Sequence, residues 1–122
     1  MILVDTSIWI DHLRRGEASL VQLLLAHRVV THNYVIGEIA LGNLHKRQVV
    51  LDNLDNLPKL PLATDPEVRH LIEREKLFGR GIGYVDAHLI AAVKLSPGTE
   101  LWTRDKRLKT VLDMLGLSAP FH

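Results

Sequence analysis

The 122-residue chain has no cysteine, only 5% aromatic residues and no long apolar run. The lack of thiols excludes disulfides, thiolate zinc sites and cysteine nucleophiles. The longest stretch without Asp, Glu, Lys or Arg runs from Ala18 to His27, and it is too short for a membrane-spanning helix, which needs about 20 apolar residues. Asp5 appears early with no basic segment before it, unlike a secretory signal. We therefore expect a cytoplasmic protein with no membrane partner.

The rest of the composition is that of one ordinary globular domain. Hydrophobic residues make up 47% of the chain, which excludes intrinsic disorder. The length suits a single domain, and no repeat, linker or low-complexity tract divides it, so we predict one domain over residues 1–122. With 15 Lys and Arg against 14 Asp and Glu, the formal net charge of +1 does not indicate a class of partner.

Short apolar runs alternate with segments of helical spacing along the whole chain. Strands are predicted at residues 1–4, 28–31 and 99–103, with weaker strand signals at 59–60 and 117–121. Helices are predicted at residues 6–14, 18–27, 33–44, 46–56, 64–77, 84–94 and 106–115. This alternation predicts an α/β fold, a three-layer sandwich in which a mostly parallel sheet of four to five short strands has helices on both faces.

Two of the predicted helices begin with capping signals. Thr64, Pro66 and Glu67 combine a capping oxygen, a proline in the first turn and an acid near the positive end of the helix dipole. Asn33 is the predicted N-cap of the helix at 33–44, because a short polar side chain there can accept a hydrogen bond from the first turn.

Acids follow two of the predicted strands. Asp5 ends the first strand, and Asp105 follows the strand that ends at Thr103. Open parallel sheets bind ligands at the carboxyl ends of their strands, so these two carboxylates converge if the strands are neighbours. The alternative is that each acid only caps the helix that it precedes.

Two further acids interrupt apolar helix faces. Glu38 has Tyr34, Val35 and Leu41 at helical spacing, and a carboxylate on that stripe is predicted to point toward the core. Asp86 lies near the start of a helix that is otherwise mostly apolar. An unpaired buried carboxylate costs on the order of several kcal/mol, so each acid needs a partner. The alternatives are a buried salt bridge for Glu38 and stabilisation of the helix dipole for Asp86.

A single pocket that collects these four carboxylates requires a cation. Two such charges about 5 Å apart repel by roughly 3 kcal/mol at an effective dielectric constant near 20. Carboxylate oxygens select hard ions, which predicts Mg²⁺ or Mn²⁺, and no histidine pair has the four-residue spacing of a zinc helix motif. Such a site permits hydrolysis of phosphodiesters by a metal-activated water, with no protein nucleophile.

Four segments, in this order and spacing, form the most specific pattern in the sequence. They are MILVDTS at residues 1–7 with Trp9 following, VIGEI at 35–39, GIGYVDA at 81–87 and LWTRD at 101–105. Together they resemble the PIN-domain ribonucleases of the VapC type, the toxins of type II toxin–antitoxin systems, and the resemblance covers essentially the whole chain. It implies metal-binding and catalytic acids at Asp5, Glu38, Asp86 and Asp105. It also implies supporting hydroxyls on Thr6, Ser7 and Thr103.

The resemblance implies a function and a set of partners as well. The resemblance implies a Mg²⁺-dependent endoribonuclease that cleaves structured RNA, and transfer RNA is the expected substrate. A cognate VapB-like antitoxin inhibits the active site and forms hetero-oligomers with the toxin. The resemblance therefore implies an RNA substrate, an antitoxin partner and a homodimer for this chain.

An acidic pocket repels RNA until metal is bound, so RNA contacts are expected from basic residues near it. The candidates, which lie around Asp105 in the sequence, are Arg104, Lys106, Arg107 and Lys109. The alternative for these residues is a solvated helix face or salt bridges. Aromatic residues are few, and Trp9, Tyr84 and Trp102 are predicted to lie in the core, so a broad base-stacking platform is not expected.

Two other functions are compatible with parts of the pattern. A receiver-like phospho-switch also uses an acidic Mg²⁺ pocket, but it needs adjacent acids after the first strand, where Asp5 stands alone. Its phospho-acceptor would lie in mid-chain, where Asp52 and Asp55 fall in a predicted amphipathic helix. The second alternative is a catalytically inactive PIN-like protein that acts only by binding, and the presence of all four acids argues against it.

Overall fold

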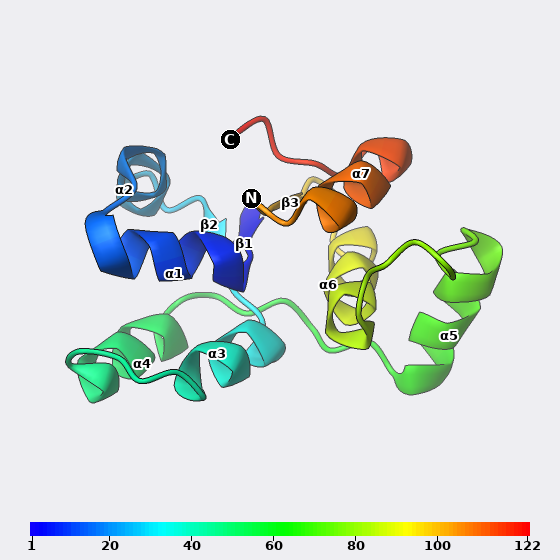
Figure 1. The fold of residues 1–122 in the computed structure, drawn as a ribbon. Helices are drawn as coiled ribbons and strands as arrows, with labels where there is room; N and C mark the ends of the chain where they lie inside the picture. The colour runs from blue at the N-terminus through cyan, green and yellow to red at the C-terminus, as the bar shows by residue number, and fades with distance from the viewer.

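A parallel sheet lies at the centre of the protein, which is described over residues 1–122 by a computed structural model (Figure 1). Its strands β1 (Ile2–Val4), β2 (Val29–Val30) and β3 (Glu100–Trp102) are ordered β2-β1-β3. Ile2 lies opposite Val29 on one side and Glu100 on the other. Every strand residue except Glu100 is buried, as expected of a parallel sheet that is covered on both faces.

Seven helices cover the two faces of this sheet. Figure 1 shows four of them on one side, namely α1 (Thr6–Arg15), α2 (Ala18–Leu25), α3 (Asn33–Ala40) and α4 (Arg47–Asp55). The other side carries α5 (Asp65–Arg74), α6 (Tyr84–Lys94) and α7 (Lys106–Leu115). In α6, residues 87–93 are all buried, which explains why this helix is apolar nearly all round. The predicted three-layer α/β sandwich is confirmed.

The sheet has fewer strands than the four to five predicted. The two weaker signals appear only as single parallel bridges, between Thr31 and Lys59 at one edge and between Leu101 and Ser118 at the other. At the first of these bridges the preceding donor position is Pro58, which has no N–H to donate, so that segment does not extend into a strand.

The helix ends differ from the prediction at both ends of α3, and α2 and α5 end two and three residues earlier than predicted. The N-cap of α3 is His32 and not Asn33, because the Nδ1 atom of His32 accepts a hydrogen bond from the backbone N–H of Tyr34 at 2.9 Å. The α3 helix ends at Ala40 and not at residue 44 as predicted. The residues from there to Lys46, which has a left-handed φ of 50°, form turns that connect α3 to α4. The predicted capping of α5 by Thr64 is confirmed, since Thr64 and Glu67 exchange hydrogen bonds.

The hydrophobic core is one cluster of 27 buried residues between the sheet and its helices. Trp9 and Trp102 belong to it, as predicted. The prediction for Tyr84 is wrong, because 48% of its surface is exposed and its hydroxyl donates to Asp65. None of the helices has the length and apolar character that crossing a membrane requires.

Candidate active site

Asp5 lies where β1 meets α1, beside the end of the neighbouring strand β3. The backbone N–H of Asp5 donates to the carbonyl of Trp102 at 2.9 Å, which continues the pairing of the two strands. The Asp5 side chain is buried and makes no capping bond to α1. Its Oδ2 atom instead accepts from the hydroxyls of Ser7, at 2.9 Å, and Thr103, at 2.7 Å. The capping alternative therefore does not apply to Asp5.

The same two hydroxyls connect Asp5 to the turn between β3 and α7. The Ser7 and Thr103 hydroxyl oxygens are 3.4 Å apart. Ser7 Oγ accepts from the backbone N–H of Arg104, and Thr103 Oγ1 accepts from that of Asp105, each at 3.1 Å. The start of α1 and the start of α7 are therefore tied together through one small polar network.

Glu38 lies on α3 and is held by the first residue of α1. Thr6 Oγ1 donates to Glu38 Oε1 at 2.9 Å. The prediction that Glu38 points into the core is wrong, because Val35 and Ile39 form the buried stripe of α3 and Glu38 is exposed beside it. Partial burial raises the pKa of the Glu38 carboxyl, the bond from Thr6 opposes that shift, and the charges of Asp5 and Asp86 add to it.

Asp86 lies in the first turn of α6, half-buried. Its Oδ2 atom accepts from the backbone N–H of Gly83 at 3.1 Å. Burial raises the pKa of the Asp86 carboxyl, the bond from Gly83 opposes the shift, and the charges of Asp5 and Asp105 raise the pKa further. Since Glu38 is also affected by Asp5 and Asp86, the four acids form one electrostatically coupled group.

Asp105 is exposed, like Glu38, and it is the acid for which the capping alternative does apply. Its Oδ1 atom accepts from the backbone N–H groups of Arg107 and Leu108, both at 3.0 Å, and so caps α7. This bonding fixes the direction of the carboxylate and occupies one of its two oxygens.

All four carboxylates share this arrangement, in which the protein holds one oxygen and leaves the other without a hydrogen bond. The free oxygens are Asp5 Oδ1, Glu38 Oε2, Asp86 Oδ1 and Asp105 Oδ2. A set of hard oxygen donors whose charges raise the pKa of Glu38 and Asp86 fits a divalent cation such as Mg²⁺. In their present positions, no three of these side chains already surround a point where a metal would bind.

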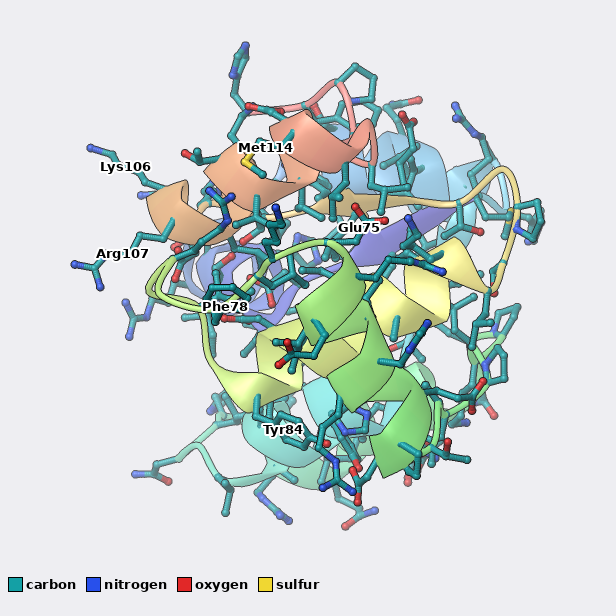
Figure 2. The ribbon with its side chains drawn as sticks, turned by 90° about the vertical axis from the view of Figure 1, so that its right-hand side faces the viewer. Glu75, Phe78, Tyr84, Lys106, Arg107 and Met114 are labelled. Atoms are coloured by element: carbon teal, nitrogen blue, oxygen red, sulfur yellow. The ribbon has the colours of Figure 1, made fainter.

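The four predicted RNA-contact residues fall into two groups. Arg104 forms ion pairs with Asp11 at 2.7 Å and Glu17 at 2.6 Å, and Lys109 pairs with an acid one turn further along α7. Arg104 and Lys109 therefore form salt bridges, as the alternative to RNA contact proposed. Lys106 and Arg107 form no ion pair, and Figure 2 shows both leaving the first turn of α7 toward solvent.

Two exposed residues near this site were missed by the sequence analysis. Phe78 and Arg80 lie on the loop before α6, and Phe78 is 60% exposed. The alternation of these residues with Gly79 and Gly81 in the sequence FGRG is the local signal that could have indicated an exposed loop.

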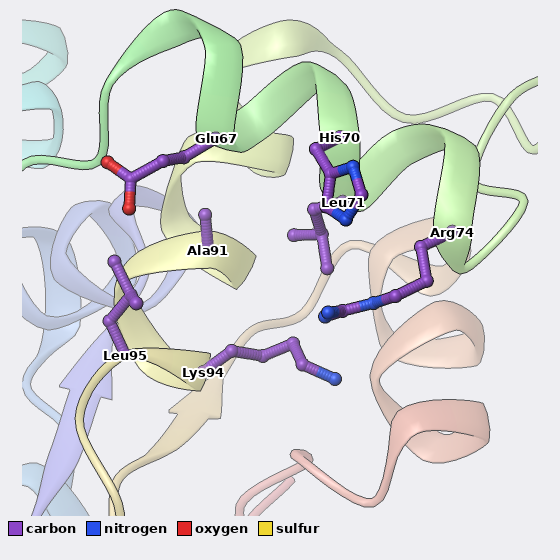
Figure 3. Close-up of a pocket in the computed structure, with 7 residues that line it drawn as sticks. All are labelled: Glu67, His70, Leu71, Arg74, Ala91, Lys94 and Leu95. Carbon is purple, nitrogen blue, oxygen red and sulfur yellow. The ribbon is translucent and has the colours of Figure 1, made fainter.

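A separate cavity lies between α5 and α6 and contains none of the four acids (Figure 3). It is lined by Glu67, His70, Leu71, Arg74, Ala91, Lys94 and Leu95. Its two cations, Arg74 and Lys94, both pair with Glu75, at 3.5 and 3.2 Å. Their charges are therefore compensated within the protein.

Comparison with known proteins identifies the family to which the chain belongs. The family model described as the PIN domain matches residues 2–112, and the chain belongs to the PIN domain family. It is 51% identical over 118 residues to Ribonuclease VapC32 of Mycobacterium tuberculosis, in the strains CDC 1551 / Oshkosh and ATCC 25618 / H37Rv. That match covers 97% of this chain and 95% of each relative. The resemblance to the VapC type is confirmed, and the family leaves no support for a receiver-like switch.

Proposed function

We propose that this protein is a divalent-metal-dependent endoribonuclease and the toxic component of a type II toxin–antitoxin module. The observation that carries the proposal is the group of four coupled carboxylates, Asp5, Glu38, Asp86 and Asp105, each held through one oxygen with the other left free. The name of the two M. tuberculosis relatives supports ribonuclease activity.

In the proposed mechanism, Asp5, Asp86 and Asp105 would hold Mg²⁺ or Mn²⁺. The chemistry that such an ion would supply is neutralisation of the scissile phosphate and a lowered pKa for the attacking water. Glu38 binds a second ion or orients the water, and Thr6 fixes its carboxylate through the 2.9 Å bond. Ser7 and Thr103 keep the Asp5 carboxylate in one orientation throughout.

The proposed substrate and partners follow from the family. We propose structured RNA, transfer RNA in particular, as the substrate, and cytoplasm as the location. We further propose a homodimer that forms a hetero-oligomer with a VapB-like antitoxin. A basic side chain of the antitoxin inserted among the four acids would neutralise them as a metal does, and charge reversal at that side chain should release the toxin.

The nuclease proposal is tested with purified, antitoxin-free protein and total RNA. Cleavage should require Mg²⁺, stop on addition of EDTA and be lost in Asp86→Asn. Asp52→Asn is the matched control, because it also removes one carboxylate charge but from the exposed face of α4. Equal cleavage by wild type and Asp86→Asn would contradict the assignment. Binding without cleavage by the wild type would favour the inactive, PIN-like alternative.

The toxin and substrate proposals need a test in cells. Expression of the wild type should slow growth, whereas expression of Asp86→Asn should not. Co-expression of a small open reading frame adjacent to the gene should relieve the effect. Sequencing of the RNA 5′ ends that appear in wild type and not in Asp86→Asn identifies the substrate, and an absence of transfer RNA ends would contradict that part of the proposal.

A further inference from the structure

The loop before α6 and the first turns of α7 border an open cavity of about 230 Å³ with an uncompensated positive charge. It is lined by Gly79, Arg80, Arg107, Thr110 and Val111. Neither arginine forms an ion pair, whereas Arg74, Lys94 and Arg104 elsewhere in the protein are paired with acids. Two guanidinium groups at one cavity repel each other unless an anion lies between them.

The backbone holds Arg80 at this cavity and leaves room for Arg107 beside it. Arg80 Nε donates to the carbonyl of Lys76 at 2.9 Å, which leaves its terminal nitrogens free. Arg107 crosses directly over Gly81, which has a φ of +78°. A Cβ on Gly81 would lie 2.7 Å from Arg107 Cδ and 3.1 Å from Nη1, so a larger residue at position 81 would displace the arginine side chain from its present position.

An exposed aromatic ring lies on the same loop. Phe78 is 60% exposed, and it lines a neighbouring apolar hollow that shares Gly79 with the basic cavity. Figure 2 shows Phe78 on the loop below α7, on the side where Arg107 extends. An aromatic face beside unpaired arginines is the combination that binds single-stranded nucleic acid, because bases stack on the ring while cations bind the backbone.

Both segments that form this cavity are attached to the candidate active site. The loop ends at Gly83, whose N–H donates to Asp86, and Arg107 itself donates its backbone N–H to Asp105. The cavity is therefore formed by the same two segments that hold Asp86 and Asp105 in place.

We propose that Phe78, Arg80 and Arg107 form a binding subsite for single-stranded RNA, in which Phe78 stacks on a base and the two arginines bind the flanking phosphates. The subsite deepens the proposed function and rests on it, because it assigns the residues that bring RNA to the acids. It favours substrates whose cleaved segment is an unpaired loop, since only an unpaired base can stack on Phe78.

The test separates binding from cleavage. Affinity for a short fluorescein-labelled single-stranded RNA is measured by fluorescence anisotropy in EDTA, for wild type, Arg80→Gln, Arg107→Gln and Phe78→Leu. Arg28→Gln is the matched control, because Arg28 is an exposed, unpaired arginine before β2. Each arginine variant should lower the slope of log affinity against log salt by about 0.7, the value for one phosphate contact on a single strand. Phe78→Leu should weaken binding about fivefold or more without changing that slope.

Three contrary results are distinguishable from one another. If the wild type binds RNA and all three loop variants match it in affinity and salt slope, the subsite is overturned and the nuclease proposal stands. If the variants lose affinity as expected but the wild type cleaves no RNA with Mg²⁺, the nuclease proposal fails and the subsite stands. Preserved RNA affinity combined with lost binding to an acidic peptide would also overturn the subsite, in favour of a protein partner.

Discussion

Thr103 Oγ1 donates a hydrogen bond of 2.7 Å to Asp5 Oδ2, although the two residues are 98 positions apart in the chain. Asp5 follows β1 and Thr103 follows β3, so this bond closes the carboxyl ends of two paired strands. Both residues are buried, and Ser7 supplies a second hydroxyl to the same oxygen. The Asp5 carboxylate is therefore oriented by the protein before any ligand binds.

Replacement of Thr103 by valine should impair both stability and cleavage. Valine keeps the shape of the side chain but leaves a buried carboxylate with one donor fewer, which costs about 1–3 kcal/mol. Loss of a group that orients a metal ligand typically lowers activity about 10- to 100-fold. Urea denaturation and RNA cleavage rates measure the two effects. Thr103→Ser keeps the hydroxyl and should retain most activity, and equal losses in the serine and valine variants would contradict the role of the hydrogen bond.

The parts of the molecule that the sequence predicts well depend on local pattern and simple topology. Short apolar runs between amphipathic segments allow only a covered parallel sheet, and acids directly after neighbouring strands must meet at one edge. Asp5 and Asp105 are placed together for this reason. Ser7 and Thr103 are indicated as supporting hydroxyls by the family resemblance and not by the strand pattern, and both bond to Asp5.

The remaining features depend on packing angles and on partners that are distant in the sequence. Glu38 differs from the core positions of α3 by one residue, and only the contact with α1 shows that it faces Thr6. Arg104 is engaged by Asp11 and Glu17, which lie about ninety residues earlier and whose direction no local pattern gives. The glycines around Phe78 indicate a loop, but the exposure of the Phe78 ring depends on how that loop packs before α6.

The raised pKa of Asp86 predicts how removal of its charge changes the thermal stability of the metal-free protein. The pKa of Asp86 is raised in the folded state, so folding favours its protonated form and the carboxylate opposes folding at neutral pH. Metal-free Asp86→Asn should therefore melt at a higher temperature than the wild type at neutral pH. The difference should shrink on acidification toward the unfolded-state pKa, near 3.8, where Asp86 is uncharged as well.

In the presence of Mg²⁺, the wild type should instead melt at a higher temperature than Asp86→Asn. A metal that binds only the folded wild type stabilises it by about 1.4 kcal/mol when its concentration is ten times Kd. Thermal melts with and without Mg²⁺ should show an upward shift of Tm for the wild type and a much smaller one for Asp86→Asn. Equal shifts in the two proteins would argue against Asp86 as a ligand, and Asp52→Asn serves as the control that should shift like the wild type.

His32 should make the fold sensitive to acid. Its Nδ1 atom accepts from Tyr34, so the neutral ring carries its proton on Nε2, which is buried without a partner. Burial lowers the pKa of His32 to about 4, with a smaller contribution from His88. An unfolded histidine takes up its proton near pH 6.5, so stability is lost as the pH falls from 6.5 to about 4, by at most about 3 kcal/mol.

Replacement of His32 by asparagine tests this assignment. Asparagine can accept the capping bond from Tyr34 but cannot titrate. The cavity that it leaves should lower the free energy of unfolding by a similar amount at every pH. Urea denaturation at several pH values between neutral and 4 should therefore give a flatter profile for His32→Asn than for the wild type, and parallel profiles would exclude His32 as the cause.

Arg104 should act on stability and not on RNA affinity. Its guanidinium lowers the pKa of both Asp11 and Glu17, chiefly through direct hydrogen bonds. Stability from these pairs is present above the unfolded-state pKa of the acids and is lost as the pH falls through their lowered folded-state values. Arg104→Met should lower Tm by about a few degrees at neutral pH, and by less in acid. Its RNA affinity in EDTA should match that of the wild type, and a loss of affinity with unchanged Tm would indicate direct RNA contact.

Gly81 provides the sharpest test of how Arg107 is positioned. Gly81→Ala places a methyl group where Arg107 now lies and also carries the strain of a positive φ, which costs about 1–2 kcal/mol. Gly98→Ala is the matched control, because Gly98 has a φ of +83° but no atom within 4 Å of the added Cβ. Both variants should lose similar stability in urea denaturation. Only Gly81→Ala should also lose RNA affinity, to the extent seen for Arg107→Gln, since the methyl group displaces the guanidinium from the cavity. Equal RNA affinity in the two alanine variants would show that the position of Arg107 over Gly81 does not matter for binding.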